Sequence, residues 1–112
     1  MFHRCRNLTN INISNFNTQK LINMESMFRS TGLESLDLSH INTSNVKYMN
    51  YLFYNSIQLK SINFGNFNTS KVTSMAHMFD NCQSLDYIDL SSFNTSAVKT
   101  MGSMFKSCIN LK

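Results

Sequence analysis

Cysteine and histidine are the residue types in this chain with the most potential for metal binding, nucleophilic attack or proton transfer. The 112 residues include three of each: Cys5, Cys82, Cys108, His3, His40 and His77. A structural zinc site needs four such ligands close together, and the sequence has neither a Cys-x-x-Cys motif nor a pair of neighbouring histidines. No serine or cysteine has a histidine and an acid in a supporting context. The pattern therefore predicts a protein that is not an enzyme, with no catalytic residues, no metal site and no cofactor.

The segments that position these residues repeat along the chain. One aromatic position recurs at steps of 25, 26 and 26 residues: Phe28, Phe53, Phe79 and Phe105. A period in this range is typical of solenoids, in which each unit buries its apolar side against its neighbours. We therefore expect a single repeat array over 1–112, with a partial unit at 1–15, units at 16–40, 41–66 and 67–92, and a partial unit at 93–112.

Each unit contains two apolar patterns. In the third unit, the first pattern has the i, i+3, i+6 and i+7 spacing of one helix face: Val72, Met75, Met78 and Phe79. Thr69 or Ser70 is placed to cap the N-terminus of such a helix. The second pattern, Leu-x-x-Ile-x-Leu at 85–90, alternates in its last part and predicts a short strand. Seven of the eight methionines fall in the inward helix columns, which indicates core packing and not redox or metal chemistry.

The cysteines share one repeat position, which in the other units holds Thr31 or Ser56. A position that accepts Cys, Thr and Ser is small and at least half buried, just after the predicted helix. We therefore interpret Cys5, Cys82 and Cys108 as free thiols of the core. The alternative is a disulfide between Cys82 and Cys108, which lie on adjacent units.

Asparagine also forms an unbroken repeat column: Asn17, Asn42, Asn68 and Asn94. In a stack of repeats, an inward asparagine can bond the backbone of the neighbouring turn. We expect such a ladder to set the spacing between units. The alternative is an exposed asparagine stripe that binds a ligand.

The motif of residues 85–98, followed by Met101, Met104-Phe105 and Cys108, closely resembles the BspA-like leucine-rich repeats of bacterial surface proteins. The resemblance covers nearly the whole chain, with local departures at Gln19, Thr31 and Ser56. It implies a right-handed α/β leucine-rich-repeat-like solenoid of 25–26-residue units, each with a short helix and a short parallel-sheet strand. It also implies adhesion to host proteins, matrix components or other cells, at the cell surface or outside the cell. The family offers no general catalytic residues.

The outward positions of the predicted strands form the candidate binding face: Asn12, Ser35, Asp37, Ser39, Ser61, Asn63, Tyr87, Asp89 and Ser91. Four of the six acidic residues lie in these strand segments, whereas most basic residues lie on or near the predicted helices. We interpret the strand side as a hydrogen-bonding platform for a protein or glycan, with Tyr87 as an aromatic contact. The simpler interpretation is that these side chains only face solvent.

A non-enzymatic binding module of a bacterial surface adhesin is the function that these patterns favour. The alternatives are a structural spacer in a larger surface protein and an intracellular protein-interaction scaffold. The net charge of +4 is spread over different repeat positions, so we expect no nucleic-acid partner. The N-terminal residues show no signal peptide, and no apolar run is long enough for membrane insertion. Both ends lie inside a unit and lack a polar cap, so we expect a fragment with a tendency to associate end to end.

Overall fold

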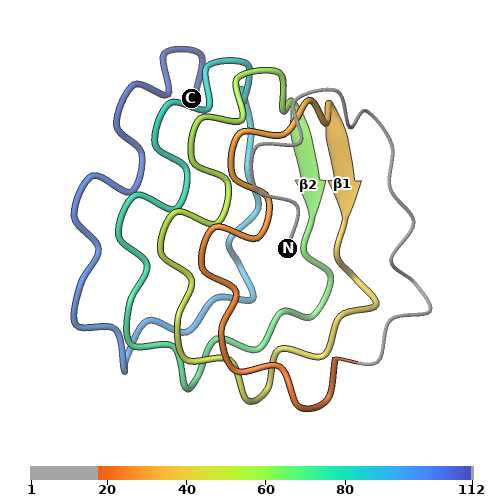
Figure 1. Cartoon of the computed structure of the whole chain (residues 1–112), viewed down its shortest axis with the longest axis vertical. Coiled ribbons are helices and arrows are strands. Elements are labelled where there is room, and N and C mark those ends of the chain that lie inside the picture. The colour runs from red at the N-terminus through yellow and green to blue at the C-terminus, as the bar shows by residue number, and fades with distance from the viewer. Residues whose placement is uncertain (1–17, 112) are drawn as a thin grey trace.

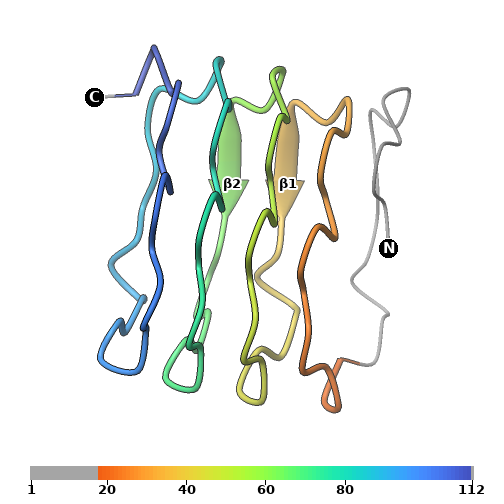
Figure 2. The same cartoon turned by 60° about the vertical axis from the view of Figure 1, so that its left-hand side comes forward.

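The chain runs in successive coils that lie side by side (Figures 1 and 2). The computed structural model describes residues 18–111. Parallel bridges join equivalent points of neighbouring coils: Asn23 to Tyr48, Tyr48 to Ser74, and Ser74 to Thr100. On another side of the stack, β1 (Ser35–Asp37) pairs in parallel with β2 (Ser61–Asn63), with Leu36 opposite Ile62. Each coil therefore meets the next in register, one repeat along the chain.

The predicted fold class is wrong. We expected a right-handed leucine-rich-repeat-like α/β solenoid with a short helix and a short strand in each unit, and residues 18–111 contain no helix. Within this range, accordingly, no helix is long and apolar enough to cross a membrane. The strand predicted at 85–90 is also absent, and the sheet of the described residues has two strands. Thr69 and Ser70 therefore cap no helix.

Backbone hydrogen bonding explains why helical spacing does not produce a helix here. The amides of Met75, His77 and Phe79 donate to carbonyls of the next coil, at 2.8 to 2.9 Å. The amides of Met78 and Asp80 donate to carbonyls three residues back, at 3.3 Å. An α-helix uses its amides for bonds to carbonyls four residues back. A segment that gives alternate amides to its neighbour therefore forms consecutive tight turns.

Left-handed residues occur at two positions of each turn segment, four residues apart. Their φ angles lie between 55 and 64°: Ser26, Ser30, Tyr51, Asn55, His77, Asn81, Ser103 and Ser107. Residues in this region interrupt a right-handed helix. The turns still return apolar side chains to one side, because Met75, Met78 and Phe79 are all fully buried. Helix-like apolar spacing is thus produced by turns.

Columns of like side chains fill the interior between the coils. Phe28, Phe53, Phe79 and Phe105 stack in sequence, with ring centroids 5.8, 5.4 and 5.3 Å apart. The core interpretation of the methionines is confirmed for six of them, which are at most 8% exposed: Met24, Met27, Met49, Met75, Met78 and Met104. Met101 is the exception, at 45% exposed. The repeat columns therefore describe the core even though the predicted elements are wrong.

At the predicted asparagine column, the polar ladder between coils is formed by the threonine that follows each asparagine. Thr69 Oγ1 donates to the Asn94 carbonyl at 2.9 Å and accepts from the Asn94 amide at 2.7 Å. Thr43 makes the same pair of bonds to Asn68. The side chains of Asn68 and Asn94 are exposed and instead accept local bonds from the residue two positions on. The predicted inward asparagine ladder is therefore wrong, and Asn17 lies outside the described residues.

Candidate binding surface

The structure describes eight of the nine residues of the candidate binding face, and Asn12 lies outside the described range. All eight are exposed, and we call them the strand-side surface: Ser35, Asp37, Ser39, Ser61, Asn63, Tyr87, Asp89 and Ser91. The pairing of β1 with β2 places Ser35 beside Ser61 and Asp37 beside Asn63. Tyr87 is the most exposed of the aromatic residues described, at 70%. Whether this surface binds a ligand stays a prediction.

Hydrogen bonds from a serine to the aspartate two positions before it fix two aspartate side chains of the strand-side surface. Asp37 Oδ1 accepts hydrogen bonds from the Ser39 amide at 2.9 Å and the Ser39 hydroxyl at 2.6 Å. Asp89 Oδ1 accepts from the Ser91 amide at 2.9 Å. Bonds from the serine hydroxyl and then from its amide hold the pKa of both Asp37 and Asp89 below the ordinary range. Both carboxylates are therefore ionised at neutral pH.

A shallow hollow of about 200 Å³ lies between two coils of this surface. Asn63, Gly65, Asp89 and Ser91 line it, together with the apolar residues Ile62 and Phe64. Small-molecule sites usually measure roughly 300–1,000 Å³ and enclose their ligand. The hollow is suited to one side chain or one sugar hydroxyl group of a larger partner.

A second group of polar and aromatic side chains meets across three coils on the turn side, and sequence reasoning did not predict it. We call it the Tyr–His cluster: Arg29, Tyr51, Tyr54, His77 and Asp80. The rings of Tyr51 and His77 stack with centroids 4.8 Å apart and planes 3° apart. The Arg29 guanidinium lies 4.7 Å from the Tyr54 ring centroid, within the range of cation–π attraction.

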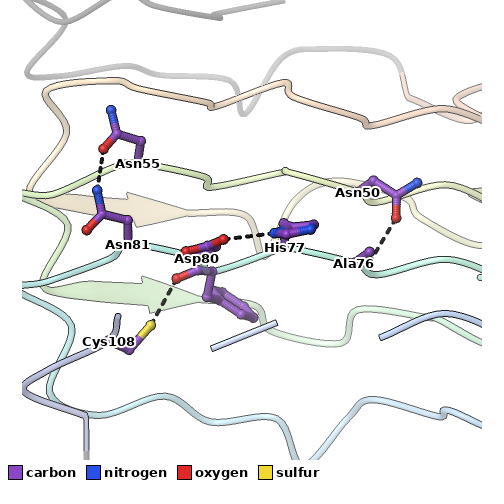
Figure 3. A network of polar contacts seen from close by, with 8 residues as sticks. Asn50, Asn55, Ala76, His77, Asp80, Asn81 and Cys108 are labelled. Carbon is purple, nitrogen blue, oxygen red and sulfur yellow. Dashed lines mark hydrogen bonds and ion pairs between the residues drawn. The ribbon is translucent and has the colours of Figure 1, made fainter. Parts of the chain in front are cut away.

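The acid of the Tyr–His cluster is buried. His77 Nδ1 lies 2.8 Å from Oδ2 of Asp80, which is 6% exposed (Figure 3). Beside this pair, Asn81 donates to the Asn55 side chain of the preceding coil (Figure 3). These contacts tie neighbouring coils together. The signal in the sequence was the column of Tyr51 and His77, which share one left-handed repeat position.

The thiols of the described residues are structural donors. Cys82 and Cys108 are free. Each donates to a phenylalanine carbonyl of the preceding coil, Cys82 to Phe53 at 3.2 Å and Cys108 to Phe79 at 2.9 Å (Figure 3 shows the latter). Ser56 makes the equivalent bond to Phe28 at 2.9 Å. The free-thiol interpretation is confirmed for these two cysteines and the disulfide alternative is wrong, while Cys5 lies outside the described residues.

Burial makes the Cys82 thiol unreactive at neutral pH. Desolvation, and then the nearby Cys108, raise the pKa of Cys82 from 9.0 to about 12. Burial also raises the pKa of Cys108. A protonated thiol is a poor nucleophile and a poor metal ligand. Within residues 18–111, moreover, no group of three or more His, Cys, Asp or Glu side chains is placed to hold a metal ion.

Cys82→Ser is expected to change the alkaline stability of the protein. The unfolded thiol ionises near pH 9.0 and the folded thiol near about 12, so the unfolded state binds fewer protons in this window. Stability is therefore fully present below pH 9 and falls as the pH rises to 12, by about 1 kcal/mol per pH unit from this group. Serine does not ionise, and Ser56 shows that it fits the position. Urea unfolding at pH 8, 10 and 11 should show a shallower decline for the variant, whereas equal slopes would contradict this assignment.

The chain matches one family model along its whole length. The family is described as Mycoplasma protein of unknown function, DUF285, and its model matches residues 1–63 and 33–112. The two matches overlap, as expected for a sequence that repeats internally. No curated protein and no solved structure matches the chain.

Proposed function

The chain belongs to the DUF285 family of Mycoplasma proteins of unknown function, and we propose that it is a non-enzymatic binding module of a bacterial surface adhesin. Its repeats, in this proposal, are those of BspA-like surface proteins. The sequence support is the long motif over 85–108, which ends at Cys108. The partner is a protein or glycan of the host or its matrix, and the module acts outside the cell.

The strand-side surface is the observation that carries this proposal. Its exposed row combines two ionised carboxylates, several hydroxyls and the exposed ring of Tyr87. The hydrogen bonds that Asp37 and Asp89 accept from the amides of Ser39 and Ser91 fix the direction of both carboxylates before any partner arrives. Groups held in this way lose little conformational entropy on binding. The surface is therefore preorganised for a partner with hydrogen-bond donors.

The chemistry of the buried groups supports a function without catalysis. The Cys82 thiol is protonated at neutral pH and donates to a backbone carbonyl. Asp80 is buried and is held by His77 inside the Tyr–His cluster. These groups serve the stacking of coils, and the exposed groups remain for recognition.

Tyr87→Ala is expected to weaken binding to the partner by roughly tenfold, because exposed tyrosines are frequent hot spots of interfaces. The full chain would be screened on an array of host matrix proteins and glycans, and the dissociation constant of each hit would then be measured for the variant. Ile109→Ala is the matched control, since Ile109 is a similarly exposed apolar residue outside the strand-side surface, at 74%. Thermal unfolding of both variants checks that each remains folded.

The same experiment separates the alternatives. A structural spacer would bind nothing on the array and would tolerate exchange of every strand-side residue for alanine. Equal loss of binding in Tyr87→Ala and Ile109→Ala would also contradict the proposed surface. An intracellular scaffold would bind cytoplasmic proteins, and the first residues of the complete gene product would distinguish this case.

A further inference from the structure

Four lysines line two adjoining hollows on the side of the stack that carries the isolated bridges. Lys20, Lys47 and Lys71 line a hollow of about 520 Å³. Lys47 and Lys71 also line a hollow of about 660 Å³, together with Lys99. Because the two hollows share two lysines, they form one open trough across successive coils. We call it the lysine trough, defined by Lys20, Lys47, Lys71 and Lys99.

The backbone ladder sets the spacing of these charges. The Lys47 amide donates to the Ile22 carbonyl, the Thr73 amide to Lys47, and the Lys99 amide to Thr73. Lys47 and Lys99 are thus two rungs apart in one column, with Thr73 between them. Neighbouring strands lie about 4.8 Å apart, so this pair is separated by about 10 Å along the stack. Lys20 and Lys71 occupy a second column with Asn45 between them, since Asn45 bonds to Gln19 and to Lys71.

The positive charges of the lysine trough are not neutralised. The Lys71 ammonium donates to the neutral side chain of Asn45 at 3.0 Å. The side chains of Lys20, Lys47 and Lys99 have no hydrogen bond or ion pair within residues 18–111. No carboxylate lines either hollow. The acid nearest to each lysine in sequence is engaged elsewhere. Glu25 accepts from Asn50, and Asp80 pairs with His77. Asp37 and Asp89 accept from serines two positions on. A face of one sign with no internal partner attracts a ligand of the opposite sign.

We propose that the lysine trough binds an acidic glycan, a linear sugar chain bearing sulfate or carboxylate groups, at a site separate from the strand-side surface. The positive charges run along the stack at regular intervals, which suits a polymer with regularly spaced anions. Thr73, Ser74 and Thr100 line the same hollow as three of the lysines. The Thr73 hydroxyl donates to the Lys47 carbonyl, and the hydroxyls of Ser74 and Thr100 bond to each other. Their remaining lone pairs can accept hydrogen bonds from the hydroxyls of sugar rings. A single-stranded nucleic acid is favoured by a series of aromatic stacking platforms. The trough has one aromatic ring, that of Tyr48, at 41% exposed.

Binding of heparin by the full chain tests this site. The double variant Lys47→Gln/Lys99→Gln is expected to lower the affinity for heparin at 0.15 M salt by roughly tenfold. The control Lys60→Gln/Lys106→Gln removes the same charge outside the trough, and its affinity should stay within about threefold of the unmodified chain. Lys47 and Lys99 make no side-chain bonds within the described residues, so the variant should keep its thermal midpoint. Raising the salt concentration should weaken binding of the unmodified chain more steeply than binding of the variant.

Further probes separate the ligand classes. Heparin stripped of its sulfates should bind the unmodified chain weakly. The Tyr87→Ala variant should bind intact heparin as tightly as the unmodified chain does, which would show that the lysine trough is separate from the strand-side surface. An equal loss of affinity in the two double variants would overturn the lysine trough. If a mixed-sequence oligonucleotide bound more tightly than heparin, the face would be assigned to nucleic acid. If vesicles containing phosphatidylserine bound more tightly than heparin, it would be assigned to a membrane. Either result would overturn the glycan proposal. Absence of heparin binding at low salt would overturn it as well.

Discussion

Gly65→Ala is expected to destabilise the folded chain by about 3 kcal/mol, because two costs coincide at this position. Gly65 has a φ of +54°, a region that L-residues with a side chain seldom adopt. A Cβ atom there would lie 2.7 Å from Ser39 Cβ and 2.9 Å from Ser39 Cα on the neighbouring coil. The second contact is with backbone, so rotation of a side chain cannot relieve it. For a domain of this size, the thermal midpoint should fall by roughly 10–20 °C.

Gly102→Ala is the matched control for this experiment. A Cβ atom at Gly102 would meet nothing within 4 Å, so the substitution should change the unfolding free energy by less than about 0.5 kcal/mol. Ser39→Gly in the Gly65→Ala background should restore part of the stability, because it removes the closer of the two contacts. If Gly65→Ala unfolded at the same temperature as Gly102→Ala, the close approach of the coils at this point would be wrong.

The repeat columns predicted which residues face the core but not which elements carry them. Met75, Met78 and Phe79 are buried as their spacing indicated, although that spacing was assigned to a helix. Apolar periodicity indicates which side chains lie on the same side of a segment, but it does not identify the backbone conformation. Consecutive tight turns also place side chains on one side of the segment at nearly helical intervals. The left-handed residues that decide between the two, such as His77 and Asn81, have no unmistakable sequence signal when glycine is absent from these positions.

The candidate surface was predictable where it follows from alternation along the strands. Asp37 and Asn63 are exposed and adjacent, as outward positions of parallel strands should be. The Tyr–His cluster and the lysine trough were not predicted, because the members of each are divided between two repeat columns and differ in residue type within a column. Lys47 and Lys71 lie in different columns, and only the stacking of coils brings them to the same hollow. Such staggered sets appear in the sequence as scattered charges.

Thr69→Val is expected to destabilise the protein by about 2 kcal/mol, although valine has nearly the same shape as threonine. The Thr69 side chain is fully buried, and its hydroxyl satisfies both the amide and the carbonyl of Asn94 on the next coil. Valine would leave both backbone groups without this partner, and a lost partner costs more than the net value of a bond. Urea unfolding would measure the change in the unfolding free energy.

Two substitutions show whether the hydroxyl or the volume of Thr69 matters. Thr69→Ser keeps the hydroxyl and loses a methyl group, so it should cost about 1 kcal/mol, less than Thr69→Val. Thr95→Val changes the next residue of the same column, which is exposed and has no side-chain bond within residues 18–111, and it should be nearly neutral. A larger loss in Thr69→Ser than in Thr69→Val would mean that packing, and not the ladder, dominates. The reverse order would establish threonine as the residue that holds each coil at its distance from the next, because Thr43 forms the same two bonds one coil earlier.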